Sequence, residues 1–461
     1  MISDKFGQVI LGAALAGSLI LAPVLSGAQT LADTLVAAYE NSNLLDQNRA
    51  LLRAADEDVA TAVSALRPVV DFIATADYTG RQQGFEVDDL TASLGLSADL
   101  LLYDFGRTRL GVDSARETVL ATRQALIDLE QRVLLTAVTA FMNVRSASEF
   151  VSIRENNVRV LTEERRAARD RFEVGEVTRT DVSIAEARLS AARSSLQAAR
   201  GDLVTAREDY KFATGRFPDS LSRVSTLPDL PDTLEAAKSV GARDHPSIRQ
   251  AQHEVTVAEL NAERAKAATR GRLSARADLL TDEELQNETT RLSLTFRQPI
   301  YRGGQLSALY RQALARSAST KALLLQQVRT IEQDIGRAWS DLRVALARIE
   351  SDRQQVEAAR VAFEGAREEA RLGARTTLDV LDLEQDLLTA RGNLIASQNA
   401  RNVAAYTVLS SIGLLTVEHL NLGIPTFDPS VYYNAVRTAP ATSVQGKRLD
   451  RVLQSIGRAR N

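Results

Sequence analysis

The sequence contains no cysteine. Disulfide bonds, thiolate metal sites and catalytic thiols are therefore excluded, and so is lipid attachment through a cysteine at a signal cleavage site. Whatever holds this protein to a membrane must be non-covalent.

Proline is also scarce, with 10 among 461 residues, whereas Ala, Leu, Arg, Glu and Gln are abundant. This composition is typical of long helices and coiled coils, which proline would interrupt. The 56 basic and 59 acidic residues give a net charge of −3. That balance provides no electrostatic basis for binding nucleic acid.

Histidine is rarer still, and the three histidines do not suggest an enzyme. His245 precedes Pro246 at an expected helix start, where it is interpreted as a local cap, and His253 and His419 are the only others. No phosphate-binding glycine-rich loop is present. The sequence therefore predicts no enzymatic activity, no cofactor and no resident metal.

Only one long apolar run occurs, from Val9 to Leu25, and it ends in Ser26-Gly27-Ala28. Small residues at these positions favour signal peptidase cleavage, so residues 1–28 are interpreted as a signal peptide. The alternative is an N-terminal anchor helix. No other run approaches the length of a membrane-spanning helix, which predicts an exported protein without a helical anchor.

One sequence feature organises the rest of the chain: landmark residues recur 198 positions apart. The pairs are Gly106 and Gly304, Gly175 and Gly373, Asp181 and Asp379, and Gly215 and Gly413. A long repeat at one fixed offset indicates two copies of a single structural unit.

Within each copy, heptad spacing predicts a long helical hairpin, at 106–215 and at 304–413. The first seam is Leu120, Ile127, Leu134 and Phe141, and the second is Val328, Ile335, Leu342, Ile349, Val356 and Phe363. Alanines recur along the second helix of the first hairpin, which allows close helix packing. An ordinary antiparallel coiled coil would show the same pattern. Further helices are expected at about 31–66 and 247–268.

Before each hairpin the hydrophobic period changes to two, at about 69–103 and 272–301. Val70, Phe72 and Tyr78 alternate with polar residues, as do Leu292, Leu294 and Phe296. Runs of about ten residues with one apolar and one polar face are typical of outer-membrane barrels, although a half-buried soluble sheet alternates in the same way. Four strands cannot close a barrel, so the chain is expected to oligomerise; a trimer would supply twelve strands and a usable pore.

The predicted organisation is therefore mixed α and β, mostly α. A signal peptide at 1–28 is followed by repeat one at 29–215, a linker at 216–244, repeat two at 245–417, and a C-terminal segment with a mobile tail at 418–461.

These features together resemble the TolC-like outer-membrane efflux proteins. The resemblance rests on the signal peptide, the doubled unit, the strand exit Gln298-Pro299-Ile300-Tyr301-Arg302-Gly303-Gly304 and the two hairpin turns ending in Gly175 and Gly373. It implies a homotrimer with a twelve-strand barrel in the outer-membrane lipid and a twelve-helix periplasmic tunnel. It also implies a passive exit duct for small molecules or proteins, served by a periplasmic adaptor and an inner-membrane pump of RND or ABC type.

The resemblance further implies a periplasmic gate at the hairpin turns. Asp379 and Asp382 would form two rings of three carboxylates that concentrate cations and where cations could block the pore. The alternative is that they only place negative charge at a helix N-terminus. Arg375 would link the second hairpin to Thr180 and Asp181. Ala370 departs from the aromatic residue that some members have there.

The hairpin tips, Gly175 and Gly373 with Val174 and Leu372, would contact the adaptor. A competing hypothesis is that the chain is itself a periplasmic coiled-coil adaptor or structural protein. That hypothesis explains the heptads and the export, but not two strand pairs placed identically in both copies.

Overall fold

The structure is a computed structural model that describes residues 28–79, 89–224, 226–282, 288–438 and 451. The predicted signal peptide lies outside the described residues except for Ala28, and so does the predicted tail beyond 438 except for Arg451.

The two repeats have the same order of elements, as predicted. The first contains α1 (Leu31–Asn41), α2 (Asn43–Ser64), β1 (Val69–Thr79), β2 (Asp89–Tyr103), α3 (Arg107–Glu173) and α4 (Arg179–Thr214). The second contains α5 (Leu234–Asp244), α6 (Pro246–Ala267), β3 (Arg272–Asp282), β4 (Glu288–Arg297), α7 (Gln305–Arg371) and α8 (Thr377–Ser411), and is followed by α9 (Pro429–Val436). The predicted mostly helical fold with four strands per chain is confirmed.

Two local differences from the sequence prediction have simple causes. The expected helix at 31–66 is divided at Ser42, whose extended backbone ends α1 and whose side chain accepts a hydrogen bond from the Leu45 N–H to begin α2. The expected linker contains a helix, α5, which begins where the Thr233 side chain accepts from the Ala236 N–H. Capping residues, rather than hydrophobic periodicity, define both boundaries.

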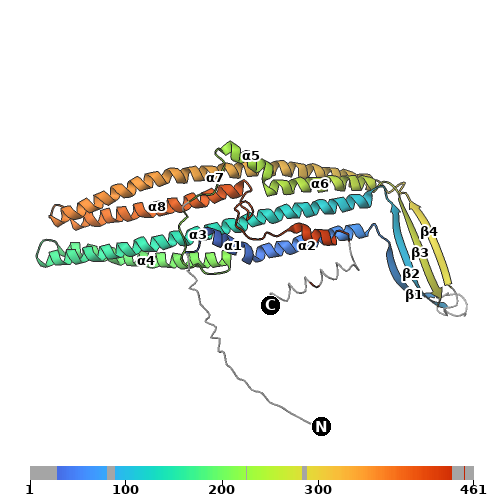
Figure 1. The fold of residues 1–461 in the computed structure, drawn as a ribbon, viewed down its shortest axis with the longest axis horizontal. Helices are drawn as coiled ribbons and strands as arrows, with labels where there is room; N and C mark the ends of the chain where they lie inside the picture. Colours follow the sequence, from blue (N-terminus) through green and yellow to red (C-terminus); the bar gives the residue numbers. More distant parts are fainter. Residues whose placement is uncertain (1–27, 80–88, 225, 283–287, 439–450, 452–461) are drawn as a thin grey trace, which may run out of the picture.

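The molecule is elongated, with the sheet at one end and two hairpin turns at the other (Figure 1). Both α3 and α7 contain 67 residues, which corresponds to roughly 100 Å of helix. Towards the turns the helices lie side by side in the order α4, α3, α8, α7, and towards the sheet in the order α2, α3, α6, α7. Each long helix therefore changes neighbours halfway along its length.

The main core lies midway along the molecule, where these helices exchange neighbours. Phe141, Tyr210, Ile335 and Leu409 are fully buried there. Towards the turns the core narrows to a seam of Leu189 with small residues such as Ala185 and Ala192. Small side chains allow the helices to approach closely, as the alanine spacing predicted.

Residues in left-handed conformation begin both long helices. Gly106 and Gly304 have φ values of 83° and 82°, and the preceding residues, Phe105 and Gly303, have 58° and 56°. A left-handed conformation costs a residue with a side chain about 1–2 kcal/mol. Phe105 is held by its neighbours, because its ring lies 4.8 Å from that of Tyr103 and beneath the guanidinium of Arg270.

The four strands form one antiparallel sheet in the order β1-β2-β3-β4, which leaves β1 and β4 as edges in the single chain. The register places apolar residues opposite each other on one face, as in Phe72 with Leu96 and Ala275 with Leu294. Phe72 and Leu294 are 70% and 65% exposed. An apolar sheet face this exposed needs another apolar medium to cover it. Among the described helices, none is both long enough and apolar enough to cross a membrane.

Candidate functional site

The two hairpin turns lie at the end of the molecule farthest from the sheet (Figure 1). Each closes a long helix with the same hydrogen bond, from the Glu176 N–H to the Arg171 carbonyl and from the Ala374 N–H to the Glu369 carbonyl, both 2.9 Å. This pattern requires a left-handed residue, which is Gly175 in one turn and Gly373 in the other.

The helices after the turns begin with matching capping boxes. Thr178 and Asp181 cap α4, and Thr376 and Asp379 cap α8. In both boxes the threonine hydroxyl donates to the aspartate at 2.7 Å. These hydrogen bonds, followed by those from the threonine N–H groups, lower the pKa of both aspartates. Asp379 therefore has the helix-capping role that was the alternative interpretation of the sequence. Its lowered pKa favours the ionised carboxylate.

Asp382, one turn further along α8, has a different partner. Its Oδ1 accepts a hydrogen bond from Arg188 Nη2 in α4 at 2.8 Å, which joins the first hairpin to the second. Sequence reasoning missed Arg188. Comparison of the two copies could have singled it out. Position 188 corresponds to Asp386 in the second copy, so copy one carries a basic residue where copy two carries an acidic one.

Arg375 forms an ion pair within its own turn. Its Nε lies 2.8 Å from Glu369 Oε2. Thr180 is exposed and Asp181 bonds to Thr178, so within the described part of this single chain Arg375 pairs with neither of them. The link expected from Arg375 to a neighbouring hairpin therefore remains a prediction about an assembly.

Between the turns and the middle of the molecule, contacts between polar side chains connect the two hairpins. Arg367 in α7 lies 3.1 Å from Glu164 in α3. Asn157 donates to both oxygens of Glu384 at 2.6 Å, and both residues are buried. Burial raises the pKa of Glu384 and the hydrogen bond from Asn157 opposes that rise. Charged groups at the contact between hairpins are therefore partly desolvated.

Ala370, where the sequence departs from an aromatic residue, is buried against Phe363 and Val380 between α7 and α8. Its carbonyl accepts a hydrogen bond from Arg171 Nη1 at 3.4 Å. The hairpins thus meet at this level through an arginine-to-backbone contact.

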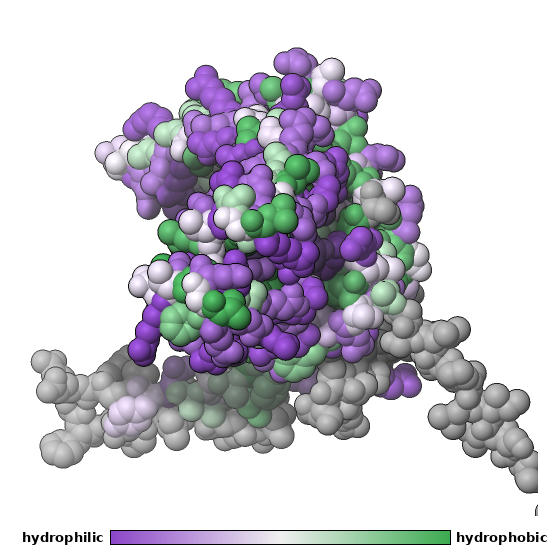
Figure 2. All heavy atoms as spheres, turned by 90° about the vertical axis from the view of Figure 1, so that its left-hand side faces the viewer, coloured by the Kyte–Doolittle hydropathy of each residue, from purple (hydrophilic) through white to green (hydrophobic). Residues whose placement is uncertain are grey.

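The tips themselves present apolar side chains to solvent. Val174 is 71% exposed and Leu372 is 85% exposed. Figure 2 looks onto this end of the molecule and shows hydrophobic residues scattered among hydrophilic ones. One exposed apolar side chain thus lies at the end of each long helix, next to its turn.

His245, far from the turns, has the role that the sequence predicted. Its Nδ1 accepts a hydrogen bond from the Ser247 N–H at 3.2 Å and caps α6. Burial lowers its pKa, so the ring is neutral and able to accept.

Comparisons with known proteins agree with this architecture. The family described as "Outer membrane efflux protein" matches twice, over residues 34–216 and 242–414, which correspond to the two repeats. The efflux protein BepC of Brucella suis is 32% identical over 438 residues, covering 93% of this chain and 95% of BepC. TolC of Escherichia coli is 22% identical and covers 92% of each chain.

Solved structures show the same fold. A CusC structure superposes with a TM-score of 0.77 at 19% identity, over 83% of this chain and 91% of that one. The outer-membrane channel OprN superposes with a TM-score of 0.74 at 24% identity, over 83% and 89% of the two chains.

Proposed function

This chain belongs to the outer membrane efflux protein family and is an outer-membrane export channel with a periplasmic extension, and we propose that three copies form one duct. The family match covers the strands as well as the helices, which disfavours the competing hypothesis of a periplasmic adaptor or structural coiled coil. The channel is not an enzyme, so transport through it needs energy from a partner.

The proposal of a trimer rests on the four-stranded sheet, which has two edges and one exposed apolar face. In lipid, an open edge leaves backbone groups unsatisfied at several kcal/mol each. Pairing β1 of one copy with β4 of the next removes every edge. Two copies would give eight strands with an interior filled by side chains, whereas three give twelve strands around an open pore.

The hairpin turns of the three copies would form the periplasmic gate. Asp379 and Asp382 supply carboxylates one helical turn apart on α8, and the pair of Asp382 with Arg188 holds the hairpins of each copy together. Arg375 and Glu369 lie at the same level, and Arg375 would exchange Glu369 for Thr180 and Asp181 when neighbouring hairpins meet. Each exposed pair contributes about 0–1 kcal/mol, so closure depends on several pairs acting together.

The exposed tips would receive a periplasmic adaptor, with Val174 and Leu372 providing apolar contacts and Gly175 and Gly373 shaping the turns. The adaptor would connect the duct to an inner-membrane pump of RND or ABC type. Relatives include both efflux proteins and protease secretion proteins, such as AprF of Pseudomonas aeruginosa. The cargo is accordingly either small molecules or proteins.

Envelope fractionation with native mass measurement tests this function. We expect the protein in the outer-membrane fraction, with a detergent-extracted mass of three chains. A monomer in the soluble periplasmic fraction would contradict the proposal.

A further inference from the structure

A cluster of arginines lies where the sheet joins the helices, at the opposite end of the molecule from the candidate gate. A cavity of about 630 Å³ in this region is lined by six of them, which we call the junction arginines: Arg107, Arg264, Arg270, Arg272, Arg297 and Arg302. Among the described residues that line the cavity, Asp104 is the only acidic one. The cavity has the size of a small-molecule site and a strongly positive lining.

The junction arginines share a lack of acidic ion-pair partners among the described residues. No described acidic residue forms an ion pair with any of the six within 4.0 Å. Arg276, further along the polar sheet face, is by contrast paired, with Asp278 at 2.9 Å and Asp99 at 3.6 Å. The charge of the junction arginines is therefore not neutralised within the described chain.

The strand register brings two of these charges together. Arg272 in β3 and Arg297 in β4 are direct cross-strand partners. Like charges directly opposite each other destabilise a sheet, because their Cβ atoms lie only about 5 Å apart. Both residues are on the polar face, opposite to the face that carries Leu294 and Phe296. In the proposed barrel that polar face lines the lumen.

The repeat shows a second unfavourable placement. In copy one, Asp104 Oδ2 accepts from the N–H and the hydroxyl of Thr108, at 2.8 and 2.5 Å, and so caps the start of α3. The equivalent position before α7 is Arg302, 198 residues later. The N-terminus of a helix is its positive end and favours an anion. Copy two therefore has a cation where copy one has the anion that a helix start prefers.

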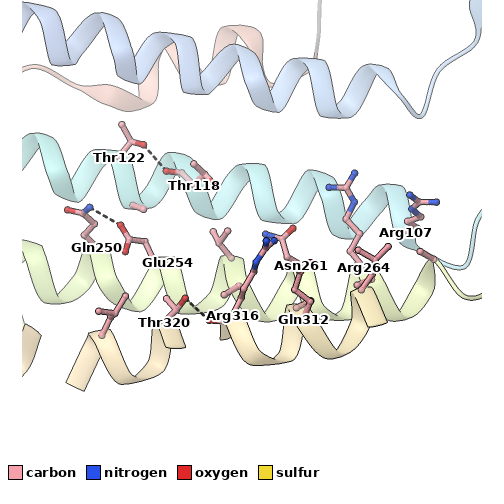
Figure 3. A pocket seen from close by; sticks show the side chains of 18 of the residues that line it. Arg107, Thr118, Thr122, Gln250, Glu254, Asn261, Arg264, Gln312, Arg316 and Thr320 are labelled. Atoms are coloured by element: carbon pink, nitrogen blue, oxygen red, sulfur yellow. Dashed lines mark hydrogen bonds between the residues drawn. The ribbon is translucent and has the colours of Figure 1, made fainter. Parts of the chain in front are cut away.

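An adjoining cavity of about 820 Å³ extends this positive surface along the helices. It shares Arg107 and Arg264 with the first cavity and adds Arg316 from α7, and Glu254 is the acid among its described lining residues. Figure 3 shows Arg107, Arg264 and Arg316 lining this cavity from α3, α6 and α7. The guanidinium of Arg264 lies over Gly111, where a side chain would meet its Cζ at 3.5 Å.

We propose that the junction arginines form an anion-binding site in the lumen, which takes a polyanionic group of the phosphate class on solutes passing through the duct. Guanidinium groups bind phosphate oxygens in pairs, and the uncapped start of α7 adds backbone N–H groups. An anion would offset both the facing charges of Arg272 and Arg297 and the reversed charge at Arg302. The lumenal location rests on the proposed trimeric barrel.

Calorimetric titration of the full-length trimer in lipid nanodiscs with inorganic pyrophosphate tests the site. We expect binding to the wild-type protein and an affinity about tenfold or more lower in Arg302→Asp, because one charge-assisted contact becomes a repulsion. The same substitution restores the carboxylate found in copy one, so the thermal midpoint without pyrophosphate should rise. Arg272→Gln, which removes a single charge from the sheet, should also weaken binding.

Arg329→Asp is the matched control, because it makes the same charge change at an exposed position of α7 that lines neither cavity. Its affinity should stay within about twofold of the wild type. An equal loss in Arg302→Asp and Arg329→Asp, or a wild-type trimer that does not bind pyrophosphate, would overturn the anion site alone. A chain that is not trimeric would instead overturn the proposed function.

A lipid headgroup carries the same phosphate chemistry, and nanodisc composition distinguishes the two sources. A site in the lumen should bind pyrophosphate equally in discs of phosphatidylcholine and in discs that also contain phosphatidylglycerol. Competition by phosphatidylglycerol would contradict the lumenal assignment and place the junction arginines against the membrane.

Discussion

Arg188 in α4 and Asp382 in α8 join the two hairpins of one chain, with Nη2 and Oδ1 2.8 Å apart. The pair lies one turn beyond the helix-capping residue Asp379 and within the segment proposed as the gate. Because both side chains are about half exposed, at 45% and 55%, the pair contributes little to overall stability. Its effect should instead be seen in how firmly the hairpins stay together.

Breaking this pair should loosen the gate. We expect Arg188→Ala to raise the single-channel conductance of the trimer in planar bilayers, with a change in unfolding free energy of no more than about 1 kcal/mol. The swapped double variant Arg188→Asp/Asp382→Arg should return the conductance towards the wild-type value. Glu364→Ala, which breaks a pair within α7, is the control and should leave the conductance unchanged.

Divalent cations should reduce the conductance by binding the carboxylates of Asp379 and Asp382. Asp382→Asn should relieve the block without disturbing a helix start, whereas Asp379→Ala should relieve it and also remove one half of the capping box of α8. Asp33→Ala removes the same kind of cap from α1 and serves as the control. If divalent cations block Asp382→Asn as strongly as the wild type, the proposal that these aspartates form cation-binding rings would be contradicted.

Asp56, which lies in α2 and away from the gate, should make the stability of the protein depend on pH. Its side chain is 1% exposed, neither carboxylate oxygen has a hydrogen-bond partner among the described atoms, and burial raises its pKa from 3.8 to about 6. Arg123 opposes the rise. Because the pKa of Asp56 is higher in the folded state than in the unfolded state, protonation of Asp56 favours folding. This contribution to stability is fully present below pH 3.8 and is lost as the pH rises through 6.

Asp56→Asn should therefore stabilise the protein at pH 7.5, by up to about 3 kcal/mol, and have little effect near pH 4. Chemical unfolding of the wild type and the variant across this range measures the difference. An equal difference at both ends of the range would show that Asp56 does not titrate on folding.

The exposed tip residues should matter for partner binding and not for folding. We expect Leu372→Ser to weaken capture of the cognate periplasmic adaptor by the immobilised trimer by about tenfold, because a few anchoring side chains carry most of the binding energy of such contacts. The thermal midpoint should not change, since Leu372 is 85% exposed. Val431→Ser, at a similarly exposed apolar residue of α9, should bind the adaptor like the wild type.

Much of this fold could be predicted from the sequence because periodicity is local. The change from a heptad to a two-residue period located the strands, and Gly106 and Gly304 marked the starts of α3 and α7. Phe105 carried no such signal, because its left-handed backbone is maintained by contacts with Tyr103 and Arg270. The short helix α9 was also missed, since an eight-residue element contains too little periodicity to detect.

The candidate site was predictable in position but not in partners. The repeat identified both hairpin turns and their capping aspartates. It did not show that Arg188 would meet Asp382, or that Arg375 would pair with Glu369, because those contacts depend on which helices become neighbours. Pairing between elements distant in sequence is decided by packing, which a single sequence does not encode locally.

Because the chain has no cysteine of its own, cross-linking between introduced cysteines tests whether three copies close one barrel. In a trimeric barrel, β1 of one copy lies beside β4 of the next, and Phe72 and Leu294 are on their apolar faces. Each chain of the Phe72→Cys/Leu294→Cys variant should therefore be joined to two neighbours by a short thiol-reactive cross-linker applied to outer membranes. We expect a covalent ladder of one, two and three chains that ends at three. A ladder that ends at two chains, or a protein that stays monomeric while each single variant reacts with a thiol label, would contradict it.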